Sequence, residues 1–167
     1  MPSTLPSPFL DSADRLSDSQ RRALAATAIA FRQAAQSGQA AHPLQGKNLG
    51  LVCEDEDSPD ATLFEQAARA LGAHVVRIRP SVAGLCNDNA LPQTARMLGR
   101  LYNAIECQGL PQEMVDRIRH HAGVPVYDGL SRFSASKRAV ATMVDGDSDS
   151  ADIRSYVLQA LLVGSVA

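Results

Sequence analysis

Short apolar runs alternate with longer amphipathic segments along most of the chain. The apolar runs predict strands over residues 49–53, 75–78, 104–107 and 124–127. Strands that alternate with crossover helices predict an α/β fold, in which a single doubly wound domain has a four-stranded parallel sheet and helices on both faces. Apolar side chains between the runs recur at helical spacing, in the groups Leu63, Ala67 and Leu71, then Met97, Leu98 and Leu101, then Met114, Val115 and Ile118.

Further helices are predicted on either side of this alternation. Ser17 and Gln20 form a capping box at the start of the first, and its apolar face packs on the outside of the domain. Ile153 and Leu161 lie on the apolar face of the last, which we also expect to pack on the domain. The predicted organisation is a mobile arm at 1–12, an α/β domain at 13–144 with a helix near 134–143, an acidic linker at 145–150 and a C-terminal helix at 151–167.

Composition narrows the classes of function. The chain has 167 residues, about the size of one domain, and its formal net charge of -2 gives no general attraction for nucleic acid or an anionic membrane. It has four Phe, three Tyr and no Trp, too few for a base-stacking surface, and no apolar run approaches the roughly 20 residues that span a bilayer. Cys53, Cys86 and Cys107 form no C-x-x-C pair, so free thiols in a reducing cytoplasm are expected, without a zinc site or a disulfide framework.

The predicted sheet also predicts where a site should lie. Ligands of open parallel sheets bind outside the carboxyl ends of the strands. The loops that follow Cys53, Ile78, Cys107 and Tyr127 are therefore the candidates. The sequence indicates no cofactor.

Three stretches carry a resemblance to a known family. They read LQGKNLGLVCE at 44–54, QTARMLGRLYNAI at 93–105 and VPVYDGL at 124–130. Together they resemble the carbamoyl-phosphate domain of the transcarbamoylases, and ornithine carbamoyltransferase most closely. The resemblance implies that the chain corresponds to the first of the family's two domains, that 145–150 stands in place of the second, and that 154–166 is similar to the family's closing helix.

The motifs that carry the family's chemistry are changed in this chain. The family's Ser-Thr-Arg-Thr-Arg motif, which holds phosphate, falls on residues 57–61, where Ser58 keeps a hydroxyl as a predicted helix N-cap and both arginines are missing. A further phosphate-contacting arginine of the family is Gln108 here, and the His-Pro-x-Gln motif falls on 135–138. The resemblance thus implies a scaffold that has lost ordinary transcarbamoylation, without catalytic residues.

An acidic loop replaces the phosphate-binding charges. Carboxylates at these positions repel a dianionic phosphate. They could instead bind a divalent cation, but a solvated loop is the better interpretation, and no metal site is expected. We define the acidic loop by its residues Glu54, Asp55, Glu56 and Asp57, and Asp60 follows it.

The sequence leaves three hypotheses about function. The leading one is an inactive interaction or scaffold module that self-associates, with a homotrimer implied by the resemblance. The second is a regulator or binder of a small molecule, such as an amino acid or a cation, and the third is a divergent enzyme or half-site. Lys137 and Arg138 either bring positive charge to the old pocket or face solvent. The candidate pocket residues are Ser58, Asp60, Gln108, Ser136, Lys137 and Arg138.

Overall fold

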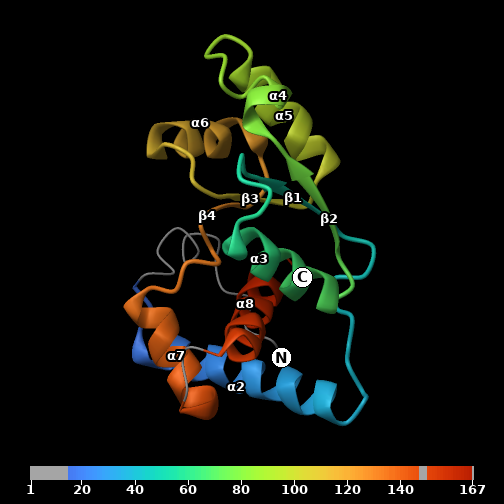
Figure 1. Ribbon diagram of the computed structural model, residues 1–167, viewed down its shortest axis with the longest axis vertical. Coiled ribbons are helices and arrows are strands. Elements are labelled where there is room, and N and C mark those ends of the chain that lie inside the picture. The colour runs from blue at the N-terminus through green and yellow to red at the C-terminus, as the bar shows by residue number, and fades with distance from the viewer. Residues whose placement is uncertain (1–14, 147–149, 167) are drawn as a thin grey trace.

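A four-stranded parallel sheet with the order β2-β1-β3-β4 lies at the centre of the computed structural model (Figure 1). The structure describes residues 15–146 and 150–166, so the predicted arm at 1–12 and residues 147–149 of the predicted linker lie outside the described residues. The strands are β1 (Asn48–Val52), β2 (His74–Ile78), β3 (Ala104–Cys107) and β4 (Val126–Asp128). The helices are α2 (Asp18–Gln36), α3 (Pro59–Ala70), α4 (Pro80–Ala83), α5 (Leu91–Leu101), α6 (Gln112–Ala122), α7 (Ala135–Asp145) and α8 (Ala151–Val166).

The predicted α/β fold with a parallel sheet is confirmed. In the register of the sheet, Leu49 of β1 lies opposite Val75 of β2 on one side and Ala104 of β3 on the other. The predicted strands agree with the observed ones to within two residues at each end. Each connection between consecutive strands contains at least one helix, and the connection from β2 to β3 passes over β1.

Alternate residues of the strands feed two separate apolar clusters, one on each face of the sheet. Val52 and Ile105 point into the smaller cluster, which packs under α5 and α6. Leu49 and Leu51 point into the larger cluster with Tyr127, and helices α2, α3, α7 and α8 complete it. Figure 1 shows these two groups of helices above and below the sheet.

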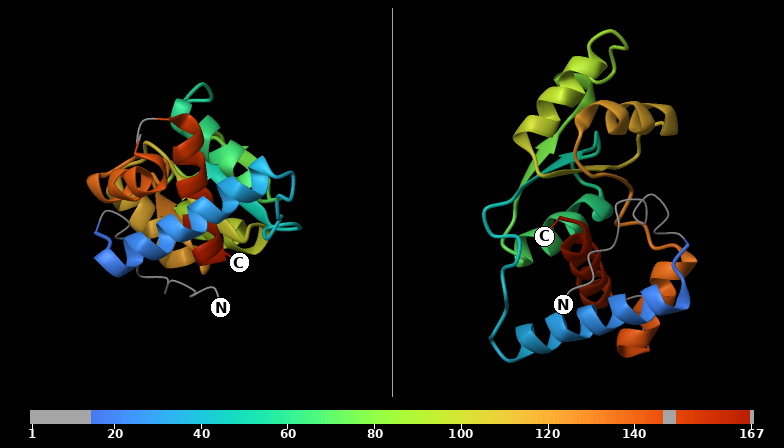
Figure 2. Two further views of the ribbon diagram at one scale, coloured as in Figure 1. Left: turned by 90° about the horizontal axis from the view of Figure 1, so that it is seen from below. Right: turned by 180° about the vertical axis from the view of Figure 1, so that it is seen from behind.

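Helix α8 packs among α2, α3 and α7, as expected from its apolar face (Figure 2). Its Ile153, Val157 and Leu161 are all buried. The predicted capping box of α2 is also present, since the Gln20 N–H donates to Ser17 Oγ at 3.3 Å and the Ser17 N–H donates to Gln20 Oε1 at 2.8 Å. Among the described residues, no helix combines the length and apolar character that crossing a bilayer requires.

The predicted apolar face of α5 is wrong in part. Leu98 is buried as expected, but the side chains of Met97 and Leu101 are 50% and 57% exposed. The helix turns Leu91 and Ala95 toward the sheet instead. Apolar residues occupy both sides of α5, so their spacing alone did not show which side is buried.

Candidate functional site

A pocket of about 350 Å³ opens where β1, β3 and β4 end, at the carboxyl ends of the strands, where the sequence predicted a site. Three loops line this strand-end pocket: the one between β1 and α3, the one after β3 and the one after β4. The sequence-predicted residues Ser58, Asp60 and Gln108 come together in it. The lining residues are Cys53, Glu54, Asp55, Ser58, Asp60, Gln108, Gly109, Gly129 and Arg132.

Ser58 caps helix α3 at the wall of the strand-end pocket. Its Oγ accepts a hydrogen bond from the Ala61 N–H at 3.4 Å, and Pro59 occupies the first turn. This is the helix start that Ser58 and Pro59 predicted. Asp60 lies in the same first turn, where the partial positive charge of a helix N-terminus favours a carboxylate.

Gln108 connects two walls of the strand-end pocket. Its Nε2 donates to the backbone carbonyl of Asp60 at 3.2 Å and to Ser131 Oγ at 3.4 Å. Its Oε1 is buried and has no hydrogen-bond partner among the described residues. A buried acceptor without a donor carries a free-energy cost, and Gln108 bears this cost at the wall of the strand-end pocket.

The acidic loop divides between the pocket and the outer surface. Glu54 and Asp55 line the strand-end pocket, whereas Glu56 and Asp57 are exposed and do not line it. The Asp57 N–H donates to Asp55 Oδ1 at 3.0 Å, which fixes the turn. The sequence left open whether these carboxylates converge in a cleft or form an exposed surface, and the structure contains both arrangements.

Arg79, which follows β2 in the chain, partly neutralises the acidic loop. Arg79 pairs with Glu54 at 3.7 Å and with Glu56 at 4.0 Å. The Ser81 N–H donates to Glu54 Oε1 at 2.6 Å. Hydrogen bonding by the side chain of Ser81, then by its backbone, lowers the pKa of Glu54, with Arg79 as a lesser cause. In residues 15–146 and 150–166, no cluster of three or more His, Cys, Asp or Glu side chains could hold a metal ion.

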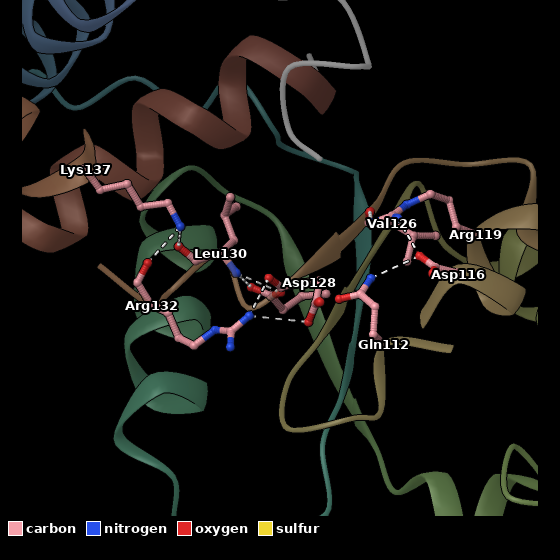
Figure 3. Close-up of polar contacts among 9 residues, drawn as sticks. Gln112, Asp116, Arg119, Val126, Asp128, Leu130, Arg132 and Lys137 are labelled. Carbon is pink, nitrogen blue, oxygen red and sulfur yellow. Dashed lines mark hydrogen bonds and ion pairs between the residues drawn. The ribbon is translucent and has the colours of Figure 1, made fainter. Parts of the chain in front are cut away.

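Arg132 is a pocket residue that the sequence analysis missed. It follows β4, pairs with Asp128 at 3.6 Å and donates to the Asp128 carbonyl at 3.2 Å (Figure 3). Its side chain is 67% exposed. Arg132 lies in the loop after Tyr127, which is one of the loops that the sequence predicted as candidates for a site. Its positive charge in that loop was the signal that could have identified it.

Ser136, Lys137 and Arg138 lie on α7, and none of them lines the strand-end pocket. Ser136 is buried, and its Oγ accepts from the Leu16 N–H at 3.5 Å. Lys137 is buried too, with its Nζ on backbone carbonyls, and Arg138 is exposed. Neither alternative for the Lys137 and Arg138 pair holds as stated, because Lys137 points into the protein and only Arg138 faces solvent.

Glu106 is a second group that the sequence analysis missed. It lies within the apolar run of β3 and is fully buried. Burial is the largest cause that raises its pKa, to about 7, while the Leu130 N–H and the nearby Lys137 oppose the shift. The sequence signal was a single acidic residue inside a predicted strand. A carboxylate that is buried there needs hydrogen-bond donors or a cation as partners.

The cysteine at the pocket wall is a poor nucleophile. Burial raises the pKa of the Cys53 thiol, and among the charged neighbours Arg77 lowers it while Asp55 and Glu56 raise it. Burial is the largest of these causes, and the two carboxylates of the acidic loop act in the same direction. All three cysteines are free thiols.

The raised pKa of Glu106 predicts a pH-dependent stability. The folded protein keeps this proton at pH values where the unfolded chain, with a glutamate pKa near 4.5, has released it. The free energy of unfolding should therefore fall as the pH rises from about 4.5 to about 7, by up to about 3 kcal/mol from this group. Glu106→Gln should remove that decrease in urea unfolding measured at about pH 5 and about pH 8.

Glu113→Gln is the matched control, because Glu113 is exposed in the first turn of α6. This variant should follow the pH dependence of the unaltered protein. An equal decrease in the Glu106→Gln variant would show that Glu106 does not hold its proton to neutral pH.

Comparisons with known proteins identify the family to which this domain belongs. A doubly wound α/β domain with a pocket at its strand ends occurs in many enzymes, but residues 9–136 match one family model in particular, described as the aspartate/ornithine carbamoyltransferase, carbamoyl-P binding domain. The match covers most of the chain. The chain therefore belongs to the aspartate/ornithine carbamoyltransferase family.

Two curated relatives show the extent of the likeness. The catabolic ornithine carbamoyltransferase of Burkholderia mallei is 40% identical over 101 residues, and that of Actinobacillus pleuropneumoniae, an ornithine carbamoyltransferase, is 38% identical over 101 residues. Each alignment covers 60% of this chain and 30% of the relative. The chain thus spans about a third of the length of the curated relatives it matches.

Solved structures agree on the fold. The ornithine carbamoyltransferase of Pyrococcus furiosus superposes with a TM-score of 0.67 at 26% identity, over 81% of this chain and 43% of that one. Aspartate transcarbamoylase of Trypanosoma cruzi, in complex with carbamoyl phosphate, superposes with a TM-score of 0.65 at 20% identity, over 84% of this chain and 48% of that one. At that identity the second likeness is one of fold alone.

Proposed function

We propose that this chain is a carbamoyltransferase-derived domain that has lost carbamoyl transfer and binds a small cationic ligand in the strand-end pocket. The observation that carries the proposal is the charge of the lining. Glu54, Asp55 and Asp60 contribute three carboxylates, of which that of Glu54 pairs with Arg79, and Arg132 contributes one guanidinium. That guanidinium is already paired with Asp128.

Carbamoyl phosphate is a poor match for this lining. A dianionic phosphate needs several cationic or N–H donors around it, and charge-assisted bonds to arginine usually supply them. Here three carboxylates face the same space, and like charges at short range raise the free energy of the bound anion. The matched family domain is described as binding carbamoyl phosphate, and we therefore propose a different ligand for this pocket.

A ligand with ammonium or guanidinium groups fits better. Such a group donates hydrogen bonds, which the carboxylates of Glu54, Asp55 and Asp60 can accept. The volume of about 350 Å³ lies at the small end of ligand pockets, which run from about 300 to 1,000 Å³. Diamines and basic amino acids are small enough to enter it.

Isothermal calorimetry with putrescine, ornithine, arginine and carbamoyl phosphate tests the proposal. At least one of the three amines should bind, with an affinity that falls as salt is added. Carbamoyl phosphate should give no measurable heat at millimolar concentration. Micromolar affinity for carbamoyl phosphate, with none for the amines, would contradict the proposal.

Asp60 and Asp57 offer a matched pair of variants. Both are aspartates of the same loop region, but Asp60 lines the strand-end pocket and Asp57 does not. Asp60→Asn should weaken amine binding by about tenfold or more, because a charge-assisted hydrogen bond contributes roughly 1.5 to 3 kcal/mol. Asp57→Asn should leave the affinity within about twofold. Equal effects in the two variants would mean that only the overall charge of the loop matters.

The loss of activity has its own test. The chain, incubated with carbamoyl phosphate and ornithine, is expected to form no citrulline above the uncatalysed rate, because the lining provides one paired guanidinium for the phosphate. A colorimetric citrulline assay, with an active ornithine carbamoyltransferase as positive control, measures this. Turnover that requires Arg132 would overturn the proposal.

A second candidate function is self-association, which the surface of α5 favours. Met97 and Leu101 are half exposed beside Arg96 and Arg100, around an open groove of about 720 Å³. Val82 of α4, the helix that precedes α5 in the chain, is also exposed, at 77%. Apolar side chains grouped on one surface commonly mark an interface, and closed rotational symmetry is usual for identical chains.

We expect a homotrimer from this surface, as the family resemblance implied. Light scattering over a dilution series should give a mass near three chains, and Leu101→Glu should lower it. Gln39→Glu, at an exposed position just beyond α2 on the other side of the sheet, is the control and should leave the mass unchanged. A single-chain mass at high micromolar concentration would remove this candidate and leave the ligand-binding proposal standing.

A further inference from the structure

Glu106 and Leu130 are joined by a buried contact between the sheet and the loop after β4. Both carboxylate oxygens of Glu106 accept from the Leu130 N–H, at 3.0 and 2.9 Å. Glu106 is fully buried in β3, where the register places it between Leu51 of β1 and Tyr127 of β4. The side chain of Glu106 therefore ties this loop to the central sheet, in addition to the Gly129 N–H, which donates to the Cys107 carbonyl at 2.8 Å.

Lys137 holds the same loop from the opposite side. Its Nζ donates to the Leu130 carbonyl and to the Arg132 carbonyl, both at 2.8 Å (Figure 3). The side chain is buried, and its charge favours the ionised form of Glu106. The backbone N–H of Leu130 is thus bound by an acid and its C=O by a base.

The loop held in this way forms one wall of the strand-end pocket. Gly129 and Arg132 lie on either side of Leu130 in the chain, and both line the pocket. We propose that Glu106 and Lys137 form a buried latch that fixes the pocket wall at residues 129–132 and loosens when Glu106 takes up a proton. The latch does not depend on which ligand the pocket binds.

The chemistry of the contacts gives the direction of the effect. A carboxylate accepts an N–H hydrogen bond roughly twice as strongly as a neutral group does. Protonation of Glu106 weakens its hold on Leu130 and removes the negative charge that faces Lys137. Ionisation strengthens this local contact even though burial makes ionisation itself costly.

The groups that face Glu106 come from several elements. Lys137 of α7 favours its ionised form, and Asp128 of β4 favours its protonated form. Tyr127 of β4 and Cys53 after β1 also lie near it, and burial raises the pKa of both, so they stay neutral near pH 7. Glu106 is therefore the group that we expect to titrate near pH 7 at this place.

Nuclear magnetic resonance of the Leu130 amide tests the latch in the whole chain without any ligand. In the unaltered protein, the Leu130 amide proton should move upfield on acidification, with a midpoint near pH 7, as its bond to a carboxylate is lost. Its hydrogen exchange, corrected for the intrinsic pH dependence, should be several-fold less protected on the acid side. Gly129 and Arg132 should report the same midpoint.

Two variants assign the transition. Glu106→Gln should hold the Leu130 amide at its acid-side position throughout, and Lys137→Met should move the midpoint to higher pH. Exposed Glu113 and half-buried Lys47, which do not contact this loop, give the controls Glu113→Gln and Lys47→Met. Both controls should titrate as the unaltered protein does.

Several outcomes would overturn the latch. One is a Leu130 amide that does not move between about pH 5 and about pH 9 in the unaltered protein, a measurement that needs no variant to fold. Another is an unchanged transition in Glu106→Gln. Neither depends on amine binding, so failure of the latch and failure of the proposed ligand function are separate results.

Discussion

Deletion of α8 is expected to abolish cooperative unfolding of the chain. The helix buries five large apolar side chains against α2, α3 and α7, and each contributes roughly 1.5 to 3 kcal/mol. Their sum, about 7 to 15 kcal/mol, is comparable with the whole stability of a typical domain, about 5 to 15 kcal/mol. The five are Ile153, Val157, Leu158, Leu161 and Leu162.

Circular dichroism during urea titration measures this effect. A sloping change without a transition is the expected result for the deleted chain. Leu158→Asp makes the same point with one residue, because it buries an unpaired charge at a fully buried position. Ala151→Asp, in the exposed first turn of the same helix, should leave the midpoint nearly unchanged. A deleted chain with an undiminished transition would mean that the larger apolar cluster does not need α8.

Gly99→Ala should destabilise the domain by about 3 kcal/mol, near the upper end of overpacking effects. A methyl group on Gly99 of α5 would lie 1.7 Å from the Ala122 carbonyl oxygen at the end of α6. The obstacle is backbone, which cannot rotate away as a side chain can, so the two helices must separate. In an exposed helix the same change would stabilise by up to about 1 kcal/mol, so the sign of the result is informative.

Urea unfolding of Gly99→Ala and of a control variant decides the matter. Arg96→Ala changes the exposed side of the same helix and should move the free energy of unfolding by less than about 0.5 kcal/mol. A stabilised Gly99→Ala protein would contradict the close approach of α5 and α6.

The sequence predicted the fold well because its signals are local and repeated. The apolar runs of the strands, the Ser17 and Gln20 capping box and the face of α8 each follow from residues a few positions apart. The rule that ligands bind at strand ends then located the strand-end pocket, and Ser58, Asp60 and Gln108 were found with it.

The parts that the sequence did not predict depend on distant contacts. The face of α5 that is buried depends on α6 and the sheet, so Met97 and Leu101 were assigned wrongly. Lys137 was expected at a pocket or in solvent because its charge was considered without the carbonyls of the preceding loop, to which it donates. Glu106 meets the Leu130 N–H across 24 positions of the chain, and no local pattern encodes that distance.

The contact between α2 and α8 has a consequence for how the chain acquires its structure. These helices lie side by side although nearly the whole domain separates them in the sequence (Figure 2). During synthesis α2 emerges long before its partner, and its apolar face must wait for α8 to leave the ribosome. Long-range pairing of this kind slows folding and leaves apolar surface open to chaperones in the interval. Completion of the larger apolar cluster is thus a late event in the folding of this domain.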